Sequence, residues 1–150
     1  MNLTDTVRCV LARRANPEIW AVERTATVLE ALELMADKDV GALLVIEEGQ
    51  LCGIISERDY ARKVILLGKT SRETLVDEIM STRTFYASYD STVDECMHLM
   101  TEHRIRHLPV LDGSSIVGIV SIGDLVNWII SSHEETIRDL HAYVAGQYPG

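Results

Sequence analysis

Two pairs of polar residues stand at equivalent places in the sequence, each where an apolar strand is predicted to run into a helix. Ser56 and Asp59 lie in "GIISERDYARKV", and Ser121 and Asp124 lie in "GIVSIGDLVNWI". A serine followed three residues later by an acid is first of all a helix-capping box. The same turn suits phosphate, because free N–H groups and the helix dipole favour an anion. An ionised aspartate only accepts hydrogen bonds, which suits a ribose diol. Together these residue types indicate a nucleotide.

Two features favour ligand binding over capping alone. The pair occurs twice, at equivalent positions. Each pair also follows a strand in which a glycine leaves room for a ligand against the backbone.

The other reactive side chains form no catalytic or metal-binding pattern. No nucleophile has a base and an orienting partner, and no Walker-type loop is present, so we expect no enzyme activity. His98, His103 and His107 lie near Cys96, but their spacing does not place them on one helical face, so we expect no metal. The three cysteines are far apart in sequence, and we expect buried, reduced thiols.

These turns belong to an internal repeat. Residues 27–65 align with residues 92–130 at an offset of 65 residues and without a gap. The alignment holds through loops as well as apolar segments, which indicates duplication. The identical pairs include Thr27/Thr92, Leu34/Leu99, Met35/Met100, Leu43/Leu108, Val45/Val110, Gly53/Gly118, Ile54/Ile119, Ser56/Ser121 and Asp59/Asp124.

Each half of the repeat predicts the order strand, helix, hairpin, helix. After the short strands "IWAV" and "TFYAS", apolar residues recur at helical spacing. Two apolar runs then flank the turn "EEGQ" or "DGSS", which predicts a hairpin. Because each small sheet has a face to cover, we expect an α+β fold in which two pseudo-twofold-related modules pack sheet to sheet. The expected modules are residues 18–67 and 84–131, joined by a linker over 68–83, within one unit of residues 1–150.

Two further helices are predicted outside the repeat, near residues 5–14 and 133–145. The second module's own last helix is predicted over residues 123–130. The C-terminal helix carries an apolar stripe, which we expect to pack on the body or to contact a partner. The stripe consists of Ile137, Leu140, Tyr143 and Val144.

The composition argues against nucleic-acid and membrane partners. With 14 Lys and Arg against 23 Asp and Glu, the net charge is -9, which repels phosphate backbones and anionic lipid. No apolar run approaches the roughly 18–20 residues of a membrane span, and the N-terminus lacks a signal-peptide core. We expect a soluble cytoplasmic protein.

The motifs resemble the cystathionine-β-synthase (CBS) domain family, whose modules occur in tandem pairs. The resemblance covers about residues 18–130, and "VGALLVIEEGQLCGIISERD" and "IRHLPVLDGSSIVGIVSIGD" carry its pattern of apolar strands, Gly-apolar-x-Ser/Thr-x-x-Asp, and helix. It implies a stand-alone pair that binds adenosine ligands in clefts between the modules. The implied ligands are AMP, ADP or ATP, with NAD(H) or S-adenosylmethionine as further members of the class.

The resemblance also implies roles for individual residues. Asp59 and Asp124 would hold ribose, and Ser56 and Ser121 would lie near phosphate. The adenine would occupy an apolar slot formed by Ile54, Ile119, Val40 and Ile105.

The two halves differ in charge before the hairpin. The second half has "RIRHLPV", and Arg106 and His107 match positions from which the family often reaches phosphate; the first half has "DVGALLV" there. A basic turn of this kind can also be a solvated surface. If it binds ligand, the two clefts are unequal, and Arg58 and Lys63 could supply charge to the first.

Two functional hypotheses remain open. The protein is a regulatory module that senses adenosine ligands and signals through a dimer or a separate, unknown protein, or it is a ligand-free dimerisation scaffold. We expect a homodimer in both cases, because the second helices carry apolar residues beyond the needs of one core. These residues are Ile65, Leu66, Trp128 and Ile129.

Overall fold

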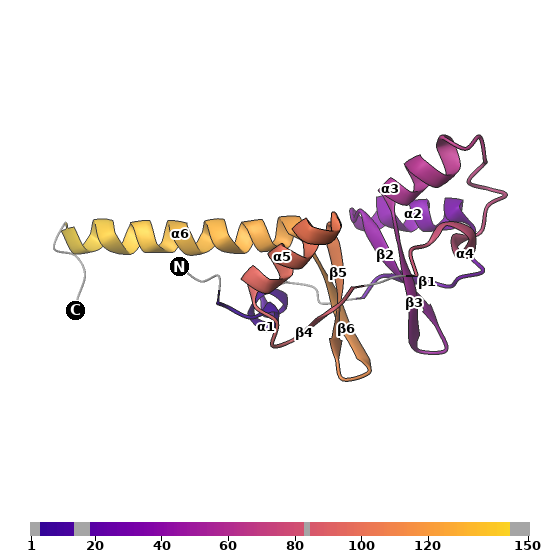
Figure 1. Cartoon of the computed structure of the whole chain (residues 1–150). Helices are drawn as coiled ribbons and strands as arrows, with labels where there is room; N and C mark the ends of the chain where they lie inside the picture. The colour runs from indigo at the N-terminus through magenta and orange to yellow at the C-terminus, as the bar shows by residue number, and fades with distance from the viewer. Residues whose placement is uncertain (1–3, 14–18, 83–84, 145–150) are drawn as a thin grey trace.

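The computed structural model describes residues 4–13, 19–82 and 85–144, which form two modules of the same design (Figure 1). The first module contains β1 (Ala21–Val22), α2 (Val28–Lys38), β2 (Ala42–Glu47), β3 (Gln50–Ser56), α3 (Glu57–Tyr60) and the π-helical turn η1 (Ala61–Ile65). The second contains β4 (Ala87–Ser88), α5 (Val93–His103), β5 (His107–Asp112), β6 (Ser115–Ser121) and α6 (Ile122–Val144). Two short helices, α1 (Val7–Ala12) and α4 (Val76–Ile79), complete the structure.

Each module has a three-stranded sheet with the same topology. β1 pairs in parallel with β2, which pairs antiparallel with β3, and β4, β5 and β6 repeat this order. Val45 lies opposite Gly53 and Val110 lies opposite Gly118, with an irregularity in register directly after each valine. The predicted α+β fold class with two pseudo-twofold-related modules is confirmed, although β1 and β4 are shorter than predicted.

Equivalent caps fix where α2 and α5 begin and end. Thr27 Oγ1 and Thr92 Oγ1 each accept a hydrogen bond from the backbone N–H three residues later, at 3.1 and 3.0 Å. Each helix ends at a residue in the left-handed region, Asp39 or Arg104, with φ of 55° in both. These ends turn the chain into β2 or β5, where the candidate site residues lie.

Buried apolar side chains form two clusters, one for each module. The first cluster joins α2, β2, β3, η1 and α4, and its members are Val28, Ala31, Met35, Leu43, Val45, Ile55, Val64, Val76, Ile79 and Met80. The second joins α1, β4, α5, β5, β6 and α6, and its members are Val7, Val10, Ala87, Val93, Cys96, Met100, Leu108, Val110, Val120 and Leu125. Each module therefore has a core of its own, and each core includes a helix from outside the predicted repeat.

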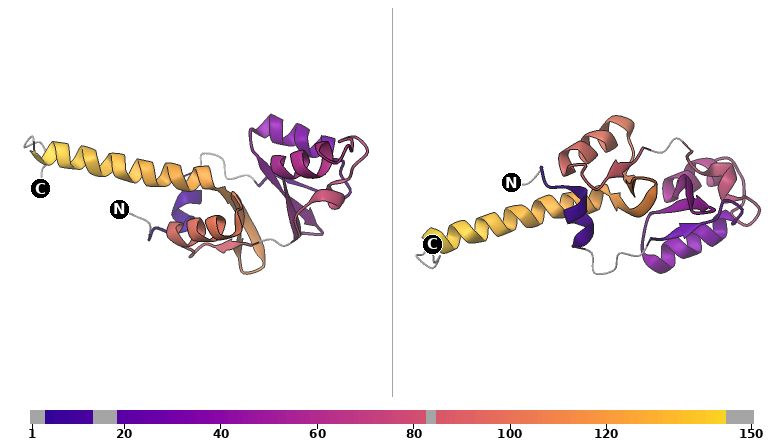
Figure 2. Two further views of the ribbon diagram at one scale, coloured as in Figure 1. Left: turned by 45° about the horizontal axis from the view of Figure 1, so that its top comes forward. Right: turned by 90° about the horizontal axis from the view of Figure 1, so that it is seen from below.

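The helices α1 and α4 play equivalent parts in opposite modules. Val7 and Val76 are fully buried, and each donates its N–H at 2.8 Å to the carbonyl two residues before α5 or α2. α4 thus belongs to the core of the module that precedes it in the chain. α1 precedes the first module in the chain but belongs to the core of the second, where it packs beside α6 (Figure 2). The sequence predicts both segments outside the repeat, but the structure makes each a part of one module.

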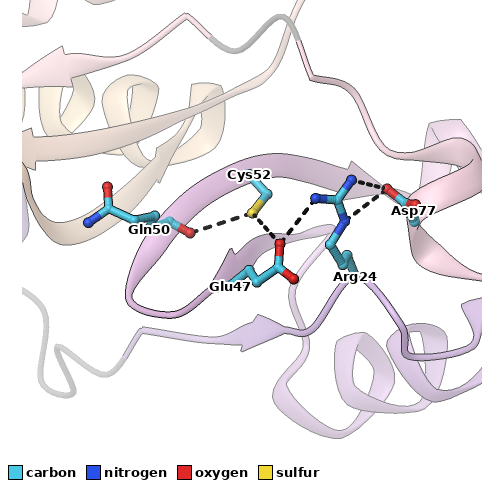
Figure 3. Close-up of polar contacts among 5 residues, drawn as sticks. All are labelled: Arg24, Glu47, Gln50, Cys52 and Asp77. Atoms are coloured by element: carbon cyan, nitrogen blue, oxygen red, sulfur yellow. Dashed lines mark hydrogen bonds and ion pairs between the residues drawn. The ribbon is translucent and has the colours of Figure 1, made fainter.

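An arginine holds α4 against the first module (Figure 3). Arg24 Nη2 donates to Asp77 Oδ1 at 2.7 Å, and its Nη1 donates to Glu47 Oε2 at 3.1 Å. These two carboxylates raise the pKa of Arg24, with the hydrogen bond to Asp77 as the main cause. Arg24 thereby connects the loop after β1, the hairpin end of β2 and the first turn of α4.

α6 is one continuous helix, whereas the sequence predicts two helices over residues 123–130 and 133–145. Ser131 and Ser132 do not interrupt it, because no proline or glycine lies between Gly123 and the end of the helix. The helix extends well beyond the second module (Figures 1 and 2). Ile137 is 54% exposed and so does not pack on the body. The side chains of the other stripe members, Leu140, Tyr143 and Val144, lie outside the described part of the structure.

The cysteines differ in environment. Cys96 is buried in the second core, and burial raises its pKa to about 11, with a smaller contribution from Glu95. Cys52 is half-buried, but Cys9 is exposed, so the prediction of three buried thiols is wrong for Cys9. Within the described residues, no helix combines the length and apolar character needed to cross a membrane.

Candidate functional site

A cleft of about 780 Å³ lies between the two modules. The first module contributes the end of β3, α3 and η1, the second contributes the turn that leads into β5, and Ser81 and Phe85 of the connecting segment also line it. Six of the ten predicted site residues meet here, and they are Ile54, Ser56, Asp59, Ile105, Arg106 and His107. The cleft therefore joins the polar turn of the first half to the basic turn of the second.

Ser56 and Asp59 form a complete capping box at the start of α3. Ser56 N–H donates to Asp59 Oδ2 at 2.9 Å, and Asp59 N–H donates to Ser56 Oγ at 3.2 Å. Asp59 Oδ1 also pairs with Lys63 Nζ at 3.2 Å, one helical turn later. The side chain of Asp59 is 15% exposed, so its carboxylate is held in a fixed position at the wall of the cleft.

His107 of the second module lies close to Gly41 of the first module. A Cβ on Gly41 would lie 3.7 Å from two ring atoms of His107 and 3.3 Å from Glu57 Oε1. The 3.7 Å distance is an ordinary van der Waals contact, so the imidazole of the second module lies close to the backbone of the first module at Gly41. Burial lowers the pKa of His107, Asp124 acts in the opposite direction, and Arg106 lowers it further.

Positive charge gathers in this cleft although the chain as a whole is acidic. Among the described lining residues there are five permanent cations and two carboxylates, and the cations are Arg58, Arg62, Lys63, Arg104 and Arg106. Arg58 Nη1 donates across the module boundary to the carbonyl of Arg104 at 2.9 Å. The cleft therefore carries a local excess of positive charge within a chain of net charge -9.

The remaining four predicted residues are not among the residues that line this cleft. Ser121 and Asp124 form the same cap at the start of α6, with hydrogen bonds of 2.8 and 3.1 Å. Asp124 lines a smaller pocket of about 280 Å³ between α1 and α6. Ile119 is half-buried on β6, and Val40 packs against the first core.

Sequence reasoning missed Arg62 and Phe85 as lining residues, and it assigned no role to Arg104, the first residue of "RIRHLPV". Arg62 follows Arg58 by four residues, which places both on one helix face and is a signal that could have identified it. Phe85, which stacks on His103 at 3.8 Å, lies in a predicted strand and gave no such signal. Within the described ranges, no group of His, Cys, Asp and Glu has a geometry suited to a metal ion.

Comparison with known proteins identifies two copies of one domain in the chain. The family model described as "CBS domain" matches residues 9–65 and 76–131. A relative in Arabidopsis thaliana, "CBS domain-containing protein CBSX3, mitochondrial", is 41% identical over 127 residues, which cover 81% of this chain and 62% of that protein. The chain thus spans less than two thirds of this relative.

Two solved structures share the arrangement. A protein with CBS domains from Burkholderia ambifaria MC40-6 is 47% identical with a TM-score of 0.82, covering 84% of this chain and 94% of that one. The CBS domain pair of protein MJ0100, solved in complex with methylthioadenosine and S-adenosyl-L-methionine, is 27% identical with a TM-score of 0.74. It covers 85% of this chain and 97% of its own.

Proposed function

The chain belongs to the CBS domain family, and we propose that it is a regulatory CBS pair that binds an adenine nucleotide in the cleft between its modules. The observation that carries this proposal is that one cleft combines Ser56 and Asp59 with Arg106 and His107. A carboxylate is a suitable acceptor for ribose hydroxyls, and guanidinium groups are suitable donors to phosphate.

The apolar part of the cleft suits a nucleobase. Ile54 lines it from β3, and Ile105 and Pro109 line it from the opposite module. Small-molecule sites combine such apolar walls with a few fixed polar groups, and they commonly have volumes of about 300–1,000 Å³. In our proposal the base lies between these side chains, Asp59 accepts from the ribose, and the phosphates face the arginines.

The charge of the cleft narrows the ligand class. The MJ0100 pair was solved with two adenosine ligands, which supports an adenosine moiety here. One of those two ligands, S-adenosyl-L-methionine, carries a sulfonium cation, which five nearby cations would repel. We therefore propose AMP, ADP, ATP or NAD(H) as the ligand. For the pseudo-equivalent residues Ser121, Asp124, Ile119 and Val40, ligand binding stays a prediction.

The regulatory output in our proposal passes through protein contacts. Ile65, Leu66 and Leu67 are 55%, 75% and 63% exposed and form an apolar patch directly after the cleft-lining helix. Trp128 and Ile129, which the sequence also assigns to a dimer surface, are half-buried against the second core and contribute less. We propose that the patch joins two copies of the chain, and that nucleotide binding in the adjacent cleft is passed on through this contact or to a separate protein.

The test is thermal unfolding of ligand-free protein with adenosine, AMP, ADP, ATP, NAD(H), GTP and CTP. A ligand at about 100 times its Kd adds roughly 2.7 kcal/mol of stability, which is a shift of several degrees in Tm. Adenine nucleotides should give this shift, and GTP and CTP should give less. No shift with any adenine compound would overturn the proposal and favour a ligand-free scaffold.

A further inference from the structure

The five cations of the cleft come from different parts of the two repeats. Arg58, Arg62 and Lys63 follow the polar turn of the first module, whereas Arg104 and Arg106 precede the hairpin of the second. Each set is on one half only. In the sequence these are two separate differences in charge between the halves, one after the polar turn and one before the hairpin. The fold places both sets of cations in the same cleft.

The pseudo-equivalent positions, 65 residues away, lack this charge completely. The counterparts of Arg58, Arg62 and Lys63 are Gly123, Asn127 and Trp128, and those of Arg104 and Arg106 are Asp39 and Gly41. Asn127 and Trp128 line the smaller pocket, whose described charged residues are Arg13 and Asp124. The guanidinium of Arg13 lies over the Trp128 ring at 4.8 Å. The larger cleft therefore has an excess of three positive charges, and the smaller pocket has none.

Most of the cleft cations are only partly neutralised by the protein. Lys63 is the exception, because it pairs with Asp59 and also donates to the carbonyl of Ile79 at 2.9 Å. Arg58 donates to a neutral carbonyl, which leaves its charge in place. Within the described part of the chain, Arg62 has neither an ion pair nor a hydrogen bond, and its side chain is exposed. These groups remain able to bind a multiply charged anion.

Resting on the function proposed above, we infer that the cleft selects nucleotides by phosphate number and that each chain binds one nucleoside triphosphate with high affinity. A nucleoside monophosphate carries about two negative charges and a triphosphate about four, so each added phosphate meets a guanidinium not used by the shorter ligand.

Calorimetry with adenosine, AMP, ADP and ATP, without divalent cations, tests this inference. At 0.1 M salt ATP should bind at least about tenfold more tightly than AMP, with one site per chain. At 1 M salt the screening length falls from about 10 Å to about 3 Å, so the preference should shrink to less than about threefold. Equal affinity for adenosine, AMP and ATP would overturn the inference but leave the proposed function intact. Two equivalent ATP sites per chain would also overturn it.

A pair of arginine variants locates the effect. Arg62→Gln removes a cation that supports no described contact of the fold, and it should weaken ATP binding about 5- to 20-fold while changing AMP binding less than twofold. Arg72→Gln is the matched control, because Arg72 is also exposed but lies outside the cleft, and its ATP affinity should stay within twofold. An equal loss in both variants would mean that only the overall charge matters, which overturns the inference. Inorganic triphosphate that binds as tightly as ATP would instead contradict the proposed function, because adenosine would then contribute nothing.

Discussion

At the scale of single residues, the two aspartates offer a matched comparison of binding with helix capping. Asp59 and Asp124 accept from the backbone N–H of their serines at 2.9 and 2.8 Å, but of the two it is Asp59 that lines the larger cleft. Asp59→Asn keeps a carbonyl acceptor for the cap and loses the charge. Hydrogen bonds to charged groups contribute about 1.5–3 kcal/mol, so we expect ATP affinity to fall about 10- to 100-fold in calorimetry.

The control for this prediction is Asp124→Asn. Both variants should lose less than about 1 kcal/mol of unfolding free energy in urea, because the two caps are alike. Because Asp124 does not line the cleft of the single inferred ATP site, its variant should keep ATP affinity within twofold, and a larger loss would instead support the predicted ribose role of Asp124. As an independent check, 2′-deoxy-ATP should bind the wild type more weakly than ATP and lose less in Asp59→Asn. Equal binding of the two sugars by the wild type would contradict the role of Asp59 as a ribose acceptor.

His107 gives the fold a pH dependence of defined sign. Burial lowers its pKa in the folded protein, whereas the unfolded chain has a value of about 6.5. Below pH 6.5 the unfolded state therefore binds more protons, so this contribution to stability is fully present above pH 6.5 and is lost as the pH falls toward the lower folded value. We expect His107→Gln to lose less unfolding free energy than wild type between pH 7.5 and 5.5, measured by urea unfolding. His98→Gln, at a side chain 72% exposed, should follow the wild type. Parallel curves for His107→Gln and wild type would contradict this prediction.

At the scale of elements, α1 should matter to stability as much as α4. Val7 and Val76 are both fully buried, at equivalent places in the two modules. Removal of two methyl groups from either should cost about 1.5–3 kcal/mol of unfolding free energy, because transfer and cavity effects add. Val7→Ala and Val76→Ala should therefore shift the urea midpoint by similar amounts, and Val126→Ala, at 39% exposure, should change stability by less than about 0.5 kcal/mol. A neutral Val7→Ala would show that α1 is dispensable to the second core.

The elements also show how far the sequence could predict the fold. The ungapped repeat identified both sheets and their hairpins, because the pattern from Thr27 to Ile65 recurs without insertions. It could not relate α1 to α4, because Val7 and Val76 are 69 residues apart, four more than the repeat offset. The two segments share little sequence similarity beyond a valine and a second apolar residue three positions later.

The site was predictable in its parts but not in its assembly. Ser56 and Asp59 were predicted from residue type and spacing, Arg106 and His107 from the resemblance to the family, and all four line one cleft. Comparing the two halves position by position cannot show that Arg106 lines the same cleft as Asp59, because that relation depends on how the modules pack.

At the scale of the whole molecule, two equally exposed isoleucines distinguish the surfaces on which a dimer could form. Ile65 is 55% exposed beside the cleft, and Ile137 is 54% exposed on the extended part of α6. We expect light scattering to give twice the 16.8 kDa chain mass for the wild type. Ile65→Glu should give a monomer, because a charge at an apolar contact is costly to bury, and Ile137→Glu should remain dimeric. The reverse result would move the dimer contact to α6, and a monomeric wild type would contradict the dimer.

Because α1 is made first but packs in the second module, the two modules become complete at different times during synthesis on the ribosome. The first module has all its parts once α4 has been made, but α1, although made first, lacks its packing partners until the second module follows. Asp5, just before α1, and Trp128 of α6, which are joined by a hydrogen bond of 2.9 Å, are 123 residues apart in the chain. At roughly 5–20 residues per second, translation takes about 6–25 s to cover that distance. Throughout this interval the apolar face of α1 is without its native partner, so Val7 and Val10 are open to non-native contacts until the second module has been made.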